Sequence, residues 1–332
     1  MVLNQASNIM LGNQEVQRVY LGKTLVWERK KSYDNTKITV IKLDSDYQET
    51  DDIQYFDTIE EAKRALNSDR QNLYKVIIGK NTNIAVISQM AFYSCINLVT
   101  ITISDSVKSI GQMAFWGCTA LESIIISNSV TNIEYGTFYN CKNLISINIP
   151  DSVIAIGNNA FSNCTNMTNI IIPNSVETIG ISAFYGCTNL TNIILSNQLK
   201  IIENYAFYNC KNLNSISIPN SVTKIGEFSF CDTSLETIFI PENVKIIENG
   251  AFQHCQNLID ITIADGVEMI GDSVFDRCFN LENVVIPASM TSIGSTAFNS
   301  CTSLKNIIIH KPENSLSGSP WGATNAEIIW TE

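Results

Sequence analysis

The chain has 332 residues, of which 45% are apolar and 16% charged, and its formal net charge is -11. This composition predicts a soluble protein with ample material for a core. The acidic balance argues against a nucleic-acid binder, since such a protein needs a basic surface to displace phosphate counterions. Only two histidines occur, His254 and His310, so we expect no metal site and no cofactor.

No apolar run approaches the roughly 18 residues of a membrane span, so membrane insertion is not expected. The start MVLNQASNIM has neither the basic nor the apolar region of a signal peptide. If Met1 is the native start, we expect a protein that folds in the cytosol.

Residues 1–31 form a leader that differs in kind from the rest of the chain. Three strand-like runs are broken at Gly12-Asn13 and Gly22-Lys23, dipeptides that are typical of hairpin turns. We expect a three-stranded β-meander, which is too small to be stable alone and should dock on another surface. Its apolar side chains are the candidates for attachment: Val16, Val19, Tyr20, Leu21, Leu25, Val26 and Trp27.

Residues 32–72 are expected to form an α/β cap. The segment TKITVIKLD predicts a strand and TIEEAKRALNS predicts a helix, with Thr58 and Glu61 placed for a capping box. Leu73, Val76 and Ile78 then predict a degenerate first strand of the repeats.

Residues 73–310 repeat with a period of 23, with one step of 22. A phenylalanine marks each repeat: Phe92, Phe115, Phe138, Phe161, Phe184, Phe207, Phe230, Phe252, Phe275 and Phe298. Such a period predicts a solenoid of about ten repeats, because one unit cannot bury its apolar face without stacking on its neighbours.

Each repeat combines a turn with a short strand. Ala183, Phe184 and Cys187 fit one face of a single helical turn, because positions four apart share a face. Leu190 and Ile193 then begin an alternating, strand-like run. We therefore predict a flattened, β-rich coil with parallel strands and one helical turn in each repeat.

This pattern resembles the leucine-rich repeats of the Treponema or BspA-like type, as in AFWGCTALESIIIS, AFSNCTNMTNIIIPNSVETIG and AFNSCTSLKNIIIH. The resemblance covers roughly residues 73–310. It implies an α/β leucine-rich repeat fold and a role in adhesion or in contact with proteins or glycans, whereas the identity of the partner does not transfer.

Nine of the ten cysteines share one register, three residues after the phenylalanine: Cys95, Cys118, Cys141, Cys164, Cys187, Cys210, Cys255, Cys278 and Cys301. They are most simply small buried side chains in a stacked ladder. Oxidation stays open, because neighbouring repeats lie about one strand spacing apart. In GEFSFCDTSLETIFIP the step from Phe230 to Leu235 is one residue short, so we predict that Cys231 alone leaves the ladder.

Residues 311–332, KPENSLSGSPWGATNAEIIWTE, abandon the period. Trp321 and the run Ile328, Ile329 and Trp330 predict a final strand that covers the last repeat, because a solenoid end would otherwise expose its core and an open strand edge.

Two rows of side chains are candidate partner-binding surfaces. The position after the repeat phenylalanine is aromatic in five repeats: Tyr93, Trp116, Tyr139, Tyr185 and Tyr208. These rings either stack on sugars or anchor a protein, or they lean on the next turn and seal the core. The outward strand position is apolar in six of ten repeats: Ile125, Ile171, Ile194, Phe239, Val285 and Ile308. This row fits an interface, although strand propensity alone also selects isoleucine and valine.

An inner row of short polar residues, from Thr100 to Asn306, is expected to form a hydrogen-bonded ladder where the coil turns, with a glycan site as the alternative. Neither a catalytic Ser/His/Asp order nor a phosphate-binding loop stands out, so no enzymatic activity is predicted.

The leader resembles a segment found in virion proteins of tailed bacteriophages, of the form GN-x-EV-x-x-YLG-x-x-LVW. The matching residues are Gly12, Asn13, Glu15, Val16, Tyr20, Leu21, Gly22, Leu25, Val26 and Trp27. Together with the missing secretion signal, this favours a non-enzymatic virion protein assembled in the host cytoplasm. Its leader would attach to the particle, and its solenoid would bind virion proteins or a host-surface protein or glycan. The alternative is a BspA-like adhesin or interaction scaffold at the bacterial cell surface, and a homo-oligomer stays open in both cases.

Overall fold

A computed structural model describes residues 33–68 and 71–331 with their side chains, together with the backbone of four strands before residue 33. The chain divides into two compact units, Met1–Asp34 and Asn35–Glu332. Each unit is described by itself.

The first unit contains two β-hairpins. Strand β1 (Ile9–Leu11) pairs antiparallel with β2 (Gln14–Val16), and β3 (Arg18–Leu21) pairs antiparallel with β4 (Thr24–Glu28). The predicted three-stranded meander is therefore wrong, because the middle run divides into two strands that pair with different partners. Strand propensity alone does not show where such a run is divided.

Several predictions for the leader fall outside the residues that the structure describes. These are the two turn dipeptides and the side chains proposed for attachment.

The second unit begins with a mixed sheet and its only helix within the described residues. Strand β5 (Ile38–Leu43) pairs antiparallel with both β6 (Glu49–Phe56) and β7 (Leu73–Ile78), and β7 continues in parallel to β9 (Leu98–Thr102). Helix α1 (Ile59–Ser68) buries Ala62 and Leu66. This sheet therefore covers the first repeat and removes its open edge.

The predicted capping box of helix α1 is confirmed. The Thr58 amide donates to Glu61 Oε2 at 3.1 Å, and the Glu61 amide donates to Thr58 Oγ1 at 3.3 Å. Strand β6 was not predicted, because its sequence ETDDIQYF is polar. As an edge strand with no fully buried residue, it has little hydrophobic pattern to detect.

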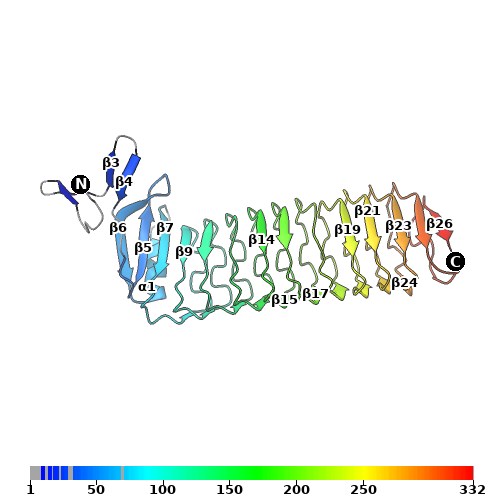
Figure 1. Ribbon diagram of the computed structural model, residues 1–332, viewed down its shortest axis with the longest axis horizontal. Helices are drawn as coiled ribbons and strands as arrows, with labels where there is room; N and C mark the ends of the chain where they lie inside the picture. Colours follow the sequence, from blue (N-terminus) through cyan, green and yellow to red (C-terminus); the bar gives the residue numbers. More distant parts are fainter. Residues whose placement is uncertain are drawn as a thin grey trace. The chain divides into compact units, whose positions relative to one another are not determined.

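Most solenoid turns contribute short parallel strands to a front series and a back series, each divided into several sheets, and Figure 1 shows these strands as successive arrows along the unit. After β9, the front strands are β11 (Ser123–Ile125), β14 (Asn169–Ile171), β16 (Asn192–Ile194), β19 (Thr237–Ile240), β21 (Asp260–Ile263), β23 (Asn283–Ile286), β25 (Asn306–Ile309) and β26 (Glu327–Trp330). The back strands are β8 (Val86–Ile87), β10 (Ser109–Ile110), β12 (Asn132–Ile133), β13 (Ala155–Ile156), β15 (Thr178–Ile179), β17 (Ile201–Ile202), β18 (Lys224–Ile225), β20 (Ile246–Ile247), β22 (Met269–Ile270) and β24 (Ser292–Ile293). The predicted β-rich solenoid with parallel strands is confirmed.

The core between the sheets is a ladder of the repeat phenylalanines. Consecutive rings are stacked with centroids 5.2 to 5.8 Å apart, and all ten side chains are buried. Apolar residues of both sheets complete the same core. Because each repeat packs mainly on its two neighbours, this is the one-dimensional packing that the period predicts.

The predicted helical turn around each phenylalanine is wrong. Residues two before and two after the phenylalanine have left-handed backbones, as at Ser182 with φ 55° and Gly186 with φ 68° on either side of Phe184. A right-handed helix cannot contain such residues, so the segment is a series of tight turns. One of these is closed by the Cys187 amide, which donates to the Phe184 carbonyl at 3.2 Å. Buried positions three or four residues apart occur both in a helical turn and in this series of tight turns. The spacing in the sequence could therefore not distinguish the two.

The last turn of the solenoid differs in part from the prediction. The predicted final strand is confirmed at Ile328–Trp330, since β26 pairs in parallel with β25. Trp321 is not part of it. This residue lies 23 positions after Phe298, is fully buried and donates from its indole Nε1 to the Ser317 carbonyl at 2.8 Å. The period therefore continues for one turn beyond residue 310, with tryptophan in the place of phenylalanine.

Candidate functional site

The cysteine ladder is a hydrogen-bonded part of the core. Eight of the nine ladder thiols, from Cys118 onward, donate to the carbonyl of the repeat phenylalanine in the preceding turn, for example from Cys187 to Phe161 at 3.2 Å and from Cys301 to Phe275 at 3.0 Å. All ten cysteines are buried, and none of them forms a disulfide. Burial raises the pKa of the Cys187, Cys255 and Cys301 thiols to about 12. A thiol with so high a pKa is a poor nucleophile, so this ladder is structural.

We expect a maleimide reagent to leave the nine ladder cysteines of the native protein unmodified at pH 7.5, whereas denatured protein reacts at every position. Mass spectrometry of tryptic peptides gives the extent of reaction at each site. Rapid native modification of Cys187 would contradict the assignment of this thiol to a closed core.

The ladder is interrupted at one repeat, as predicted. Thr233, three residues after Phe230, takes the cysteine position, and its hydroxyl donates to the Phe230 carbonyl at 2.8 Å and contacts Cys255 Sγ at 3.2 Å. The Cys231 thiol turns instead to Asp232 Oδ2 at 3.8 Å. The prediction that Cys231 leaves the ladder is confirmed.

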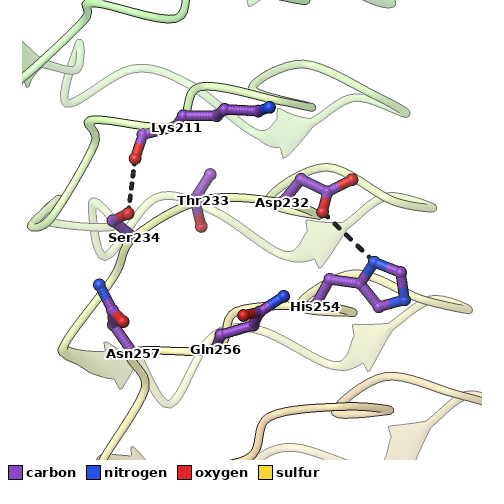
Figure 2. A pocket seen from close by; sticks show the side chains of 7 residues that line it. All are labelled: Lys211, Asp232, Thr233, Ser234, His254, Gln256 and Asn257. Atoms are coloured by element: carbon purple, nitrogen blue, oxygen red, sulfur yellow. Dashed lines mark hydrogen bonds and ion pairs between the residues drawn. The ribbon is translucent and has the colours of Figure 1, made fainter.

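A polar pocket of about 260 Å³ lies at this interruption (Figure 2). Asp232 has two side-chain contacts here: Oδ1 is 3.3 Å from His254 Nδ1, and Oδ2 is 3.8 Å from Cys231 Sγ. Partial burial, followed by the charges of Cys231 and Asp232, raises the pKa of Tyr208. The sequence showed the missing residue but not the pocket, because the neighbouring turns could have closed over the gap.

The predicted aromatic row is divided into two stacks. Tyr93, Trp116 and Tyr139 form the first, with Trp116 3.7 Å from Tyr139 between ring centroids. Tyr185 and Tyr208 form the second, with centroids 5.0 Å apart and planes 4° apart. Because Trp116 has a ring on each side, its faces are closed to a sugar, and the arrangement favours sealing of the core edge over ligand stacking.

Three further aromatic residues join these stacks and were not predicted. Tyr135 contacts Trp116, and Tyr205 contacts both Tyr208 and Phe228. Tyr205 and Phe228 each lie two residues before a repeat phenylalanine, at the left-handed position. For Tyr205 and Phe228 the signal was an aromatic residue at a position that is not aromatic in the other repeats.

The predicted apolar row lies on the strand face, defined here as the outward side of the front strands and of the segments aligned with them. Its exposed members are Ile125 at 63%, Ile171 at 64%, Ile194 at 52%, Phe239 at 54% and Val285 at 39%, whereas Ile308 is half-buried beside β26. Ile171 and Ile194 pair directly across β14 and β16. These two side chains therefore form one continuous apolar surface.

The polar row lies on the same face and is not an inner row. Residues two apart in a strand point to the same side, so Ser123 and Asn169 are exposed beside Ile125 and Ile171. Some of these polar residues bond to each other, as Ser123 Oγ does to Thr100 Oγ1 at 3.0 Å, and others bond to the residue before them, as Ser215 Oγ does to Asn214 Oδ1 at 3.3 Å. The predicted ladder at the turns of the coil is wrong in its location.

A hollow of about 480 Å³ opens in the strand face between Ile194 and Phe239. Here the front sheet is interrupted, because β16 pairs with β14 and β19 pairs with β21, while the repeat between them contributes no strand. The hollow is lined by Asn192, Ile193, Ile194, Leu195, Asn197, Ser215, Ile216, Ser217 and Pro219. It combines apolar walls with neutral polar side chains.

Among the described residues, no group of three or more His, Cys, Asp and Glu side chains is arranged to hold a metal ion. Within the same residues, no helix has the length and apolar character that a bilayer span requires.

Three solved structures are similar to this chain. A leucine-rich repeat protein from Bacteroides ovatus is 24% identical, with 75% of this chain and 88% of that chain covered and a TM-score of 0.44. One from Eubacterium ventriosum is 24% identical, with 77% and 78% covered and a TM-score of 0.48. A leucine-rich cell surface protein from Faecalibacterium prausnitzii is 23% identical, with 80% and 92% covered and a TM-score of 0.45. No curated protein matches the sequence significantly.

Comparison with protein families matches residues 85–214 and 177–305 to the BspA type leucine-rich repeat region, in six copies. Together these segments cover residues 85–305, which is more than half of the chain. The phenylalanine ladder from Phe92 to Phe298 and the front strands from β9 to β23 lie within them. The chain therefore belongs to the family of BspA type leucine-rich repeat proteins.

Proposed function

We propose that this protein is a non-enzymatic interaction scaffold at a bacterial cell surface, and that it binds a protein partner through the strand face around the hollow. The observation that carries the proposal is a group of exposed apolar side chains on the strand face: Ile194 lines the hollow, Ile171 pairs with Ile194, and Phe239 lies on the next front strand, β19. Membership of the BspA type is consistent with this role.

The geometry of the hollow matches the energetic centre of a protein interface. Binding energy concentrates where an anchor side chain fills a desolvated pocket, and neutral polar groups around it exclude water. Here Asn192, Ser215 and Ser217 supply such polar groups beside the isoleucines. The walls come from short strands and turns of a rigid core, so little conformational entropy is lost on binding.

The polar pocket does not have the geometry of a catalytic site. Its carboxylate, Asp232, already accepts bonds from His254 and from the Cys231 thiol. The adjacent thiol of Cys231 is buried, and desolvation followed by the charge of Asp232 raises its pKa, so it would not act as a nucleophile. A binding role therefore fits these side chains better than a reaction.

A virion role gains no support from the family match, which lies wholly within residues 85–305. Attachment through residues 1–31 remains a prediction that rests on the resemblance of the leader. Deletion of these residues tests it: normal incorporation of the shortened chain into particles, or normal display on cells, would rule out an attachment role.

Replacement of Ile194 or Phe239 by aspartate should abolish partner binding while leaving the melting temperature nearly unchanged, since both side chains are more than half exposed. The loss should reach about 2 kcal/mol, or roughly thirtyfold in Kd, as at an interface hot spot. Purified wild-type and variant proteins would be immobilised and exposed to surface-protein extracts of host cells, and the retained proteins would be quantified by mass spectrometry.

The matched control is Ile154→Asp, an isoleucine that is 52% exposed just before the back strand β13. A genuine partner is retained by wild type and by this control but is lost from both strand-face variants. Equal retention by all four proteins would refute the assignment of binding to the strand face. Sedimentation of the protein alone shows whether the partner is a second copy.

A further inference from the structure

A ladder of asparagine side chains runs along the solenoid two residues after the cysteines. Asn166 Nδ2 donates to Asn143 Oδ1 at 3.3 Å, and Asn212 Nδ2 donates to Asn189 Oδ1 at 3.3 Å. The ladder is exposed. Each amide can both donate and accept, so an asparagine at this position is able to bond to the repeat on either side of it.

The short repeat lacks one member of this ladder. Ser234 Oγ donates to the Lys211 carbonyl at 2.5 Å, which repeats the bond from Thr165 to the Lys142 carbonyl at 3.4 Å. Ser234 therefore still holds its regular position, and Leu235 follows it directly. The residue that is missing is the one that would carry the asparagine between Asn212 and Asn257.

The polar pocket occupies the place of that missing residue. Its lining includes Lys211, Ser234 and Asn257 around the gap, and Asp232, His254 and Gln256 beside them. Figure 2 shows Asp232 and His254 at one end of the pocket, and Ser234 with Asn257 at the other. The pocket therefore has one end from which an amide is missing and another end with the carboxylate of Asp232. The contact with His254 holds this carboxylate in place.

We propose that this pocket binds an N-acetylated amino sugar. The acetamido group takes the place of the missing asparagine amide and bonds to the Asn257 side chain, which offers both a donor and an acceptor. The hydroxyls of the ring face Asp232, Gln256 and Lys211. The Asp232 carboxylate accepts hydrogen bonds from them, the Lys211 ammonium donates to them, and the Gln256 amide does both.

The size and chemistry of the pocket distinguish this ligand from others. A volume of about 260 Å³ is below the roughly 300–1,000 Å³ typical of sites for drug-sized ligands, and it suits a single sugar ring. A side-chain amide of a protein partner would fill the gap but would leave the carboxylate end without hydroxyl donors. The pocket is separate from the hollow of the strand face, so this inference stands apart from the proposed protein-binding function.

Saturation-transfer NMR with free N-acetylglucosamine tests the proposal on the full-length protein. We expect transfer to the acetyl methyl and ring protons of N-acetylglucosamine. Transfer to the ring protons of glucosamine and of glucose should be weaker by about tenfold, because both sugars lack one polar contact. Equal signals from the three sugars, or none from N-acetylglucosamine, would overturn it.

The decisive variant inserts an asparagine between Ser234 and Leu235, which restores the 23-residue period and fills the gap. It should fold at least as well as wild type and lose the acetyl signal. His254→Asn, which keeps a residue that tolerates the left-handed backbone at φ 59°, should weaken binding through Asp232. Asn189→Ala changes the ladder away from the pocket and should bind as wild type does. Binding that survives the insertion would place the sugar elsewhere.

Discussion

Between pH 9 and 12 the solenoid should unfold cooperatively, because its core cannot hold ionised thiols. Burial raises the pKa of Cys187 from 9.0 in an exposed thiol to about 12, and it raises that of Cys164 and Cys210 in the same direction. In this range the folded state binds more protons than the unfolded state, so the free energy of unfolding falls as the pH rises. Stability from these thiols is complete below pH 9.

The effect is large because it is repeated along the ladder. A shift of three pKa units corresponds to about 4 kcal/mol for one thiol at high pH. Typical domains are stable by only about 5–15 kcal/mol, so a few ladder positions suffice to unfold the chain. Circular dichroism during an alkaline titration should show loss of structure at about pH 10 to 11, well below the pKa of the buried thiols.

Thiolate absorbance near 240 nm, recorded in the same titration and corrected for the tyrosinate band that overlaps it, separates this cause from the loss of lysine and tyrosine protons. We expect the thiolate signal and the loss of β-structure to coincide. A thiolate signal that is complete near pH 9 while the fold persists would show that the ladder is open to solvent, against the burial described above.

Phe184→Ala should divide the solenoid into two units that unfold separately. The ring of Phe184 is fully buried and stacks between Phe161 at 5.3 Å and Phe207 at 5.6 Å. Its removal leaves a cavity and should lower stability by about 3–5 kcal/mol. In a one-dimensional array the loss falls on the coupling between two neighbouring turns, so urea unfolding should change from one transition to two.

Tyr185→Ala is the matched control, because this neighbouring ring is partly exposed and stacks on Tyr208 alone among the ring contacts of the described residues. It should lower stability by about 1 kcal/mol and leave a single transition. If Phe184→Ala also unfolds in one step with a small loss, the phenylalanine ladder is not what couples the repeats.

The fold could be predicted from the sequence because its main constraint is periodic. The steps between Phe92 and Phe298 require stacking, and the nine aligned cysteines follow from the same register. Cys231 could be excluded from the ladder because it directly follows Phe230 and is therefore out of this register. The helical turn could not be excluded, because left-handed residues such as Ser182 and Tyr205 are not among the residue types that usually announce them.

The candidate sites depend on features that no single repeat contains. The hollow arises because the segment around Ser215 and Ser217 does not pair with β16, and pairing is decided between neighbouring turns. The polar pocket arises where a residue is absent, and the response of the surrounding chain determines whether the gap stays open. Exposure of the row from Ile125 to Val285 was predictable, since alternation along a strand places it outward.

The equivalence of successive turns also affects how this gene can change. Recombination between two repeats adds or removes a whole turn, and each new junction has the same phenylalanine stacking and cysteine bond as the old ones. The cap, the strand-face hollow and the polar pocket would then be shifted relative to one another in steps of one strand spacing, about 4.8 Å. Descendants of this chain can therefore vary in reach while each binding feature keeps its local chemistry.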